Sequence, residues 1–326
     1  MLKRSVLLVS FILILVSIVL SACSSTPEHE GQLYKAGLIL EGKAGEEPWN
    51  AKGYRGLTAI KEKFGVEVYF KENVETDQEV TEIVREFSQK GVNLIFGHGS
   101  KFGRSFVDMS TVYPDIHFVY FNGGQHAENV TSYNFNAHAM GFFAGMIAGE
   151  MSQTEHVGIL AAYEWQSEIE GYYEGVKHQN PAAEVHIDYV NDWNNAGSAL
   201  DAYERQRDVN VDVFYPIGNQ FSRKVIEQAA EDNLYTIGYI NDQSNIGERY
   251  VLTSTIQDVE KIYEMAAEHF DEDRLAGGVY RLGFPENVLS LGPYSQDIPR
   301  YFRNEIEHAV DMYKTTGLLP NELSVH

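Results

Sequence analysis

Short apolar runs alternate with longer mixed segments along most of the chain. The runs have the length of buried strands, and the segments between them carry the spacing of amphipathic helices. Eight strands are predicted, in two sets of four: 35–40, 66–70, 92–96 and 116–121, then 157–161, 185–190, 211–215 and 235–239. Helices are predicted between them, for example over 79–90 and 223–232. Strands that alternate with helices are typical of α/β proteins with parallel sheets.

The two sets of predicted strands repeat one another. The segment Ala36-Gly-Leu-Ile39 is echoed by Val157-Gly-Ile-Leu160, an offset of 121 residues (157 − 36), and Gly97 is matched by Gly218 at the same offset. This constancy favours a structural duplication, although two unrelated Rossmann-like halves would share the same element order. Two such lobes place the carboxyl ends of their strands at a shared cleft, where ligands of open parallel sheets bind.

The first residues have the pattern of an export signal. Residues 1–22 join Lys3 and Arg4 to an apolar run over 6–20, as in a secretory leader. A permanent membrane-spanning helix is the alternative, since the run is near the minimum length for spanning. The chain's only cysteine, Cys23, follows Leu20-Ser-Ala22 and resembles the lipid-modified cysteine of a bacterial lipobox. We therefore expect lipidation at Cys23, a polar tether over 23–33, and a body held at the extracytoplasmic face of the cell membrane.

Composition removes several classes of function. The chain has 47 acidic and 25 basic residues, a formal charge of −22, and loss of Lys3 and Arg4 with the leader makes it −24. Without a basic cluster, such a polyanion is not expected to bind nucleic acid directly. One cysteine excludes an intramolecular disulfide and a cysteine-based zinc site. There is no GxSxG, HExxH or phosphate-loop motif, so an extracellular hydrolase is the least favoured reading, and no cofactor or metal is expected.

Candidate ligand-binding residues follow the predicted strands of the first lobe. Trp49 offers a ring for stacking, or alternatively fixes a helix to the sheet, and Asn50 fits the start of that helix. Glu46 suits a hydroxyl or amine, although solvated acids are common in so acidic a chain. His98 lies between two glycines that allow close approach of a ligand. Asn122 offers donor and acceptor groups, or forms an Asn-Gly turn.

The second lobe offers a comparable set of residues. Trp165 supplies a second aromatic ring, and Trp49 and Trp165 are predicted to enclose a planar ligand between the lobes. The segment Gly218-Asn219-Gln-Phe221 supplies amides and another aromatic ring. Asp242 offers a carboxylate to hydroxyl groups, or alternatively caps the connection back to the first lobe.

Several stretches in order resemble the basic membrane protein family of bacterial lipoproteins, type I solute-binding proteins that include purine-nucleoside receptors of ABC importers. The resemblance spans about 34–320 and rests on segments 49–57, 92–99, 113–118, 129–148, 238–243 and 251–254. It implies a type I periplasmic-binding-protein fold, with two Rossmann-like lobes joined by three crossovers around a central cleft. Within the family, residues 91–99, 137–143 and 252–257 most resemble membrane-associated positive regulators of competence gene expression.

The family pattern carries over position by position. Glu46 stands at an aspartate of the first loop, Trp49 at the phenylalanine that stacks on the base, and Asn50 at a matching asparagine. Asn122 stands where the nucleoside binders have aspartate after the fourth strand. Two departures concern the ligand: Ile240 replaces an aspartate that binds ribose hydroxyls, and Gln257 replaces a frequent lysine. Loss of that carboxylate removes charge-assisted hydrogen bonds of roughly 1.5–3 kcal/mol each.

These observations give one main expectation and one alternative. The first lobe is expected over 34–128 and about 255–283, and the second over about 129–254 and 284–326, with hinges near 129–135, 243–254 and 283–290. The main expectation is a lipid-anchored receptor that passes a purine-nucleoside-like ligand to an ABC permease. The alternative is a regulator of competence genes that acts through a membrane signalling partner without contacting DNA.

Overall fold

Two six-stranded sheets form the framework of the protein in the computed structural model, which describes residues 32–45 and 48–323. Residues 33–323 of this part belong to one compact unit. The strands of the first sheet are β1 (Lys35–Ile39), β2 (Glu67–Lys71), β3 (Leu94–Gly97), β4 (His117–Phe121), β5 (Val130–Phe135) and β11 (Gly278–Leu282). Those of the second are β6 (His156–Ala161), β7 (Glu184–Tyr189), β8 (Val213–Ile217), β9 (Tyr235–Ile240), β10 (Val251–Gln257) and β12 (Leu289–Leu291).

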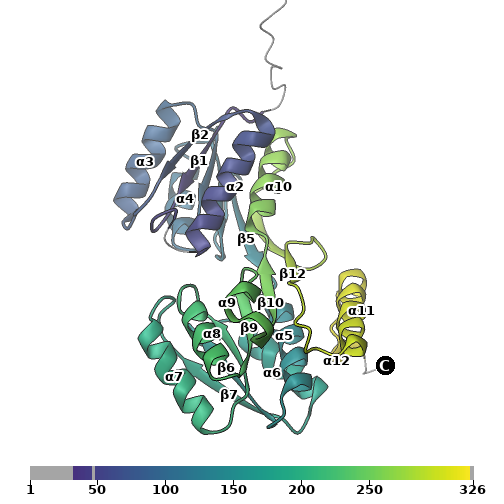
Figure 1. Ribbon diagram of the computed structural model, residues 1–326. Helices are drawn as coiled ribbons and strands as arrows, with labels where there is room; N and C mark the ends of the chain where they lie inside the picture. The colour runs from purple at the N-terminus through teal and green to yellow at the C-terminus, as the bar shows by residue number, and fades with distance from the viewer. Residues whose placement is uncertain (1–31, 46–47, 324–326) are drawn as a thin grey trace, which may run out of the picture. The chain divides into compact units, whose positions relative to one another are not determined.

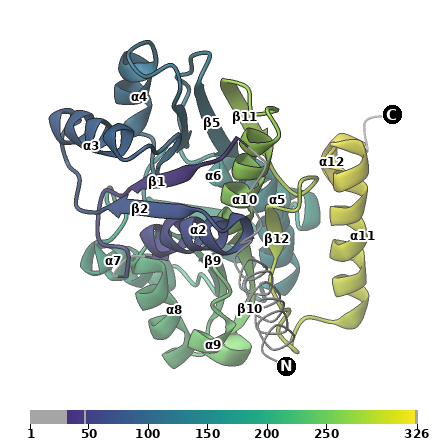
Figure 2. The ribbon, with the colours of Figure 1, turned by 90° about the horizontal axis from the view of Figure 1, so that it is seen from above.

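Helices cover both faces of each sheet, which makes each lobe a three-layer sandwich (Figure 1). The long helices are α2 (Pro48–Phe64), α3 (Asp77–Gln89), α4 (Phe102–Ser110), α5 (Ala137–Met151), α6 (Glu168–Gln179), α7 (Ala196–Asp208), α8 (Phe221–Glu231), α10 (Val259–Asp271) and α11 (Arg300–Thr316). Short turns of helix occur at α9 (Ser244–Gly247), η1 (Glu248–Tyr250) and α12 (Pro320–Leu323). Figure 2 shows α2 and α10 side by side along the first sheet.

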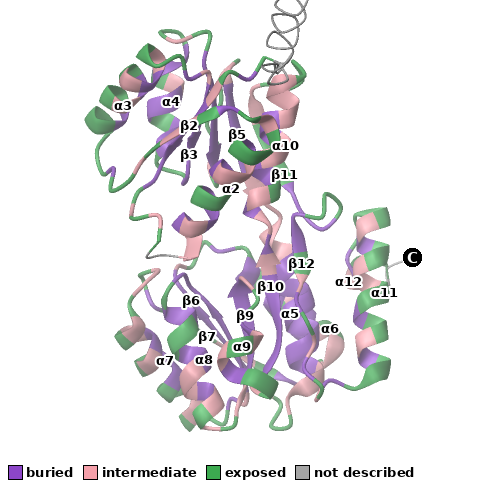
Figure 3. Cartoon of the chain, turned by 45° about the horizontal axis from the view of Figure 1, so that its top comes forward, coloured by how far each residue is buried: buried purple, intermediate pink, exposed green. Residues whose placement is uncertain are grey.

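Burial on both faces explains the continuous apolar runs of the central strands. In β1, Leu38 packs toward α2 and α10, whereas its neighbour Ile39 packs toward α3 and α4. In β6, Ile159 packs with α5 and α6, whereas Leu160 packs with α7 and α8. The central strands are therefore almost wholly buried, whereas exposed residues gather on the outer helices and on edge strands such as β2, β7 and β11 (Figure 3).

The two sheets have the same strand order and differ only in the direction of the last strand, β11 or β12. The strand orders are β11-β5-β4-β3-β1-β2 and β12-β10-β9-β8-β6-β7, and all pairings are parallel except that of β10 with β12. Gly37 and Gly158 occupy equivalent positions, because a Cβ atom at either would lie within 2.6 Å of a side chain of a helix packed on the sheet, Phe87 in α3 or Gln206 in α7. The predicted fold class and repeated architecture are confirmed.

All eight predicted strands are present, and four further strands were missed. The missed strands β5 and β10 contain buried hydroxyl residues, including Thr131 and Thr255. These residues make the two segments polar in sequence, so they lack the apolar run that predicts a buried strand. Thr131 donates a hydrogen bond to the Ala276 carbonyl and Thr255 to the Gly238 carbonyl. These bonds offset the cost of burying a hydroxyl group.

Three segments cross between the lobes. They follow β5 at Asn136, β10 at Asp258 and β11 at 283–288, and they are joined by backbone hydrogen bonds from Asn136 to Leu282 and from Asp258 to Val288. Because 130–135 and 251–257 form strands, the first two crossings lie further along the chain than the hinges expected at 129–135 and 243–254. The leader, Cys23 and nearly all of the 23–33 tether fall outside the described residues.

Candidate functional site

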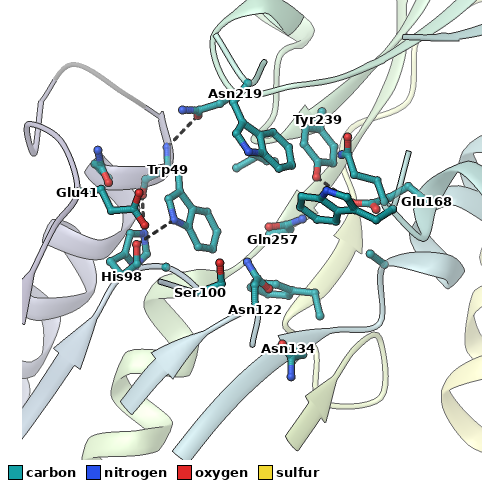
Figure 4. A pocket seen from close by; sticks show the side chains of 18 of the residues that line it. Glu41, Trp49, His98, Ser100, Asn122, Asn134, Glu168, Asn219, Tyr239 and Gln257 are labelled. Carbon is teal, nitrogen blue, oxygen red and sulfur yellow. Dashed lines mark hydrogen bonds between the residues drawn. The ribbon is translucent and has the colours of Figure 1, made fainter. Parts of the chain in front are cut away.

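A cavity of about 650 Å³ lies at the carboxyl ends of both sheets. Its lining comes from the segments after β1, β3 and β4 of the first sheet and after β6, β7 and β8 of the second (Figure 4). The strand order reverses direction between β1 and β3, and again between β6 and β8, so the loops diverge there and leave space. The volume lies within the range of small-molecule pockets, ~300–1,000 Å³.

Trp49 and His98 form the aromatic wall of the first lobe. Trp49 is the second residue of α2, and its indole stacks on the imidazole of His98 with ring centroids 4.4 Å apart. The His98 Nε2–H donates to the Trp49 carbonyl at 2.8 Å, and the Tyr263 hydroxyl donates to His98 Nδ1 at 2.9 Å. Burial lowers the pKa of His98 to about 3, which keeps the imidazole neutral and both nitrogens in these bonds.

The second lobe presents an aromatic cluster of its own. Trp165 stacks on Tyr163 with ring centroids 5.5 Å apart, and Trp193 packs edge-on against both. The Trp165 side chain is 68% exposed, an unusual position for so large an apolar ring. An exposed aromatic ring at a pocket rim gains free energy when a ligand covers it.

Amide and hydroxyl groups make up most of the polar lining. The Trp49 backbone N–H, which has no partner within α2, donates to Asn219 Oδ1 of the second lobe at 3.3 Å. Asn219 in turn donates through Nδ2 to Asn194 Oδ1 at 3.2 Å. Ser100, Asn122, Asn134 and Gln257 also line the cavity (Figure 4). Asn134 lies at its edge and donates through Nδ2 to the Gly123 carbonyl at 2.9 Å.

Glu168 supplies a buried carboxyl group. It is the first residue of α6, is 5% exposed, and accepts a hydrogen bond from the Tyr239 hydroxyl at 2.8 Å. Burial raises the pKa of Glu168 above its usual range. A carboxyl group in this environment pairs well with an amine or ring N–H of a ligand, because such a partner compensates for the water it has lost.

Ile240 holds a strained backbone conformation in the pocket wall. Its φ is +69°, a left-handed value that is a genuine outlier for a β-branched residue. The Asn241 N–H donates to the Tyr239 carbonyl at 2.8 Å, which makes the three residues a γ-turn centred on Ile240. The turn brings an aliphatic side chain to the place where the family resemblance implies a carboxylate.

Six of the predicted site residues line the cavity: Trp49, Asn50, His98, Asn122, Trp165 and Asn219. Three do not. Gly218 and Phe221 pack against each other, and Phe221 is fully buried in the core between the second sheet and its outer helices. Asp242 is exposed and accepts a hydrogen bond from the Ser244 N–H at 3.0 Å, within its own loop. Glu46 lies outside the described residues, and α2 begins at Pro48 rather than at Asn50.

Fifteen other lining residues were not among the predicted ligand-binding residues, although Ile240 and Gln257 were noted as departures from the family pattern. Trp193 and Asn194 follow the edge strand β7, where no site residue was predicted. A tryptophan just after a strand, the pattern that marked Trp165, also marks Trp193. Tyr239 and Gln257 are strand residues, and no loop signal marks them. The set comprises Glu41, Gly42, Gly99, Ser100, Asn134, Phe135, Ala137, Gln166, Ser167, Glu168, Trp193, Asn194, Tyr239, Ile240 and Gln257.

Residues 33–310 match the Bmp family, described as ABC transporter substrate-binding protein PnrA-like. The chain belongs to this family. The family is one of substrate-binding proteins, so this Bmp protein is a solute-binding protein and not an enzyme. Within residues 32–45 and 48–323, no helix is long and apolar enough to cross a bilayer.

Three known proteins are similar to this Bmp protein. The transcriptional activator protein Med of Bacillus subtilis (strain 168) is 38% identical over 98% of this chain and 99% of its own. The crystal structure of a transcriptional activator of the comK gene from Bacillus halodurans has a TM-score of 0.84 and 39% identity, covering 88% of this chain and 99% of that chain. A purine-binding protein of Brucella abortus (strain 2308) is 22% identical over 82% of this chain and 77% of its own.

Proposed function

We propose that this protein is a lipid-anchored extracytoplasmic receptor whose pocket takes a purine-nucleoside-like ligand for an ABC importer. The observation that carries the proposal is the pairing of Trp49 from one lobe with Trp165 and Trp193 from the other around a cavity of nucleoside size. A planar base gains stacking contacts from such rings. The purine-binding relative from Brucella abortus supports this ligand class.

The aromatic lining and the polar lining of the pocket recognise different parts of the proposed ligand. The aromatic rings and the buried Glu168 suit a heteroaromatic base with an N–H donor. The sugar side faces amides and hydroxyls instead of the family carboxylate, because Ile240 occupies that place. We therefore propose that the base supplies most of the binding free energy.

A thermal-shift screen of the full chain in detergent against nucleosides and free bases tests the proposal. Ligand at 100 times its Kd stabilises a protein by ~2.7 kcal/mol, a clear rise in melting temperature. Trp49→Ala and Trp165→Ala should abolish the shift. Tyr301→Ala is the matched control, since Tyr301 is an equally exposed aromatic residue outside the cavity. A flat screen up to millimolar concentration would exclude a nucleoside receptor, because importer receptors bind far more tightly.

A second function is favoured by the 38% identity to Med over nearly the whole chain. In this proposal the protein is a membrane-associated positive regulator of competence genes that signals from outside the cell. The charge of −22 disfavours direct contact with DNA. Deletion of the gene should then lower transcription of competence genes in the parent organism. Complementation with the Trp49→Ala, Trp165→Ala double variant distinguishes ligand-dependent signalling, which fails to restore transcription, from ligand-independent signalling, which restores it.

The lipid anchor has a separate test. Labelling of cells with radioactive palmitate should mark the wild-type chain but not the Cys23→Ala variant, whereas Ser24→Ala should be labelled normally. Label retained on the Cys23→Ala variant would place the lipid elsewhere and overturn this part of the proposal.

A further inference from the structure

Two histidines and a glutamate converge at the amino-terminal end of the second sheet. His156 is the first residue of β6, and Glu184 and His186 lie on the neighbouring edge strand β7. In the parallel register His156 is opposite Glu184 and Gly158 is opposite His186. Because side chains two apart on a strand share a face, all three project from the same face of this strand pair.

The ligating atoms of the three side chains lie at distances that suit one small cation. His156 Nδ1 is 2.9 Å from His186 Nε2 and 3.9 Å from Glu184 Oε2, and His186 Nε2 is 3.9 Å from Glu184 Oε1. Ligands at the usual zinc–nitrogen and zinc–oxygen distances sit about 3.3 Å apart around a tetrahedral ion. The two nitrogens are closer together than this and the carboxylate oxygens are further away. The Glu184 side chain is 67% exposed and has room to turn one oxygen toward both nitrogens.

The donor set selects the kind of metal. Two imidazole nitrogens and one carboxylate oxygen suit zinc and its transition-metal neighbours, whereas calcium and magnesium prefer oxygen ligands throughout. In the metal-free pair, one ring donates its N–H to the other across the 2.9 Å contact. Metal binding requires only that this proton move to the other nitrogen of the same ring, which leaves both facing nitrogens free to coordinate.

This cluster is separate from the ligand cavity. It lies at the start of β6, whereas Trp165 follows the end of that strand, and the five-residue rise from His156 to Ala161 spans about 17 Å. None of the three residues lines the cavity. The strong negative charge of the whole chain favours cation binding at any exposed site.

We propose that His156, Glu184 and His186 form a binding site for a divalent transition-metal ion of the zinc type, held by three protein ligands with a fourth position open to water. The site joins the edge strand β7 to its neighbour β6. It belongs to the second lobe alone and operates independently of the ligand cavity.

Equilibrium dialysis of the full chain in detergent against zinc chloride, after treatment with a chelator, tests this site. The protein is prepared without a histidine tag, because a tag would itself bind zinc. Bound zinc is measured by mass spectrometry. The expected result is one equivalent of zinc in the wild type. The affinity should fall at least ten-fold in His186→Asn and in Glu184→Gln. His126→Asn is the matched control, because His126 is exposed and remote from the cluster.

Two further results decide the matter. Circular dichroism without metal should show His186→Asn folded like the wild type, so that a lost site is not confused with a lost fold. Zinc should raise the melting temperature of the wild type and not that of this variant. Zinc binding that is unchanged in both His156→Asn and His186→Asn, or that is absent in the wild type, would overturn the proposal.

Discussion

His98 holds Trp49 from beneath, with its ring stacked on the indole and its Nε2–H bonded to the Trp49 carbonyl. The two residues exchange hydrogen bonds, because the Trp49 Nε1–H also donates to the His98 carbonyl at 3.4 Å. The imidazole is buried and both of its nitrogens are hydrogen-bonded, so it supports the Trp49 indole at the cavity wall.

Replacement of His98 should therefore weaken both folding and ligand binding. In His98→Ala, the Trp49 carbonyl loses one hydrogen bond and the Tyr263 hydroxyl loses its His98 partner. A buried group left unpaired costs about 1–3 kcal/mol. Urea denaturation measures the loss of stability. His126→Ala, an exposed histidine, should unfold like the wild type. A His98→Ala variant of unchanged stability would show that Trp49 keeps its position without this support.

Acid should destabilise the protein partly through His117. Burial lowers the pKa of His117 to about 4, and its Nε2 lies 2.8 Å from Thr131 Oγ1. The unfolded chain takes up this proton near pH 6.5, so stability is fully present above pH 6.5 and is lost as the pH falls toward 4. The stability lost over this pH range totals about 3 kcal/mol. His117→Gln keeps a donor for Thr131 and should flatten this part of the profile.

The measurement for His117 is the free energy of unfolding in urea at several pH values between 7 and 4. The raised pKa of Glu168 acts in the opposite direction within this window, so the difference between variant and wild type is the informative quantity. That difference should change by about 1.4 kcal/mol per pH unit. His126→Gln should leave the profile unchanged, and parallel profiles for His117→Gln and the wild type would contradict the assignment.

Ile240→Asp should strengthen binding of ribonucleosides. Aspartate tolerates the left-handed backbone of this position better than isoleucine, and its carboxylate restores hydrogen bonds of roughly 1.5–3 kcal/mol each. Titration calorimetry should show at least a ten-fold gain for a ribonucleoside and no gain for the free base. Ile240→Asn is the control, because it has similar backbone tolerance without the charge. Equal gains for nucleoside and base would place Ile240 away from the sugar.

Gly171→Ala should separate two helices that position the pocket. A Cβ atom at Gly171 would lie 2.0 Å from the His138 carbonyl oxygen, so α5 and α6 must move apart. Overpacking of this kind costs about 1–3 kcal/mol or more, and it displaces Glu168 at the start of α6. Gly124→Ala, where no atom lies within 4 Å of the added carbon, is the matched control in urea denaturation. Equal stability of the two variants would refute this packing argument.

The sequence predicted best what burial determines directly. Central strands such as β3 and β8 are apolar because both faces are covered, and the first tryptophan after β1 and after β6 marked the cavity. The sequence failed where polar residues are buried for reasons of long-range bonding. From the sequence, Thr131 and Thr255 favour a loop, because the carbonyl groups that pair with their buried hydroxyls are distant along the chain.

Site residues were harder to predict than strands, for related reasons. Phe221 follows a strand but turns into the core, because α8 begins there and the ring packs over Gly218. Glu168 and Tyr239 lie 71 positions apart, and only the packing of α6 near the end of β9 brings the carboxyl group to the hydroxyl. No local pattern indicates such a pair.

The cavity contains every tryptophan of the chain, since Trp49, Trp165 and Trp193 account for all three. Light near 295 nm excites tryptophan and little else in a protein, so the emission of this protein arises from its cavity walls alone. Intrinsic tryptophan fluorescence therefore reports on the cavity without an added label. A compound that enters the cavity alters this emission directly, whereas events at the distant strand ends leave it largely unchanged.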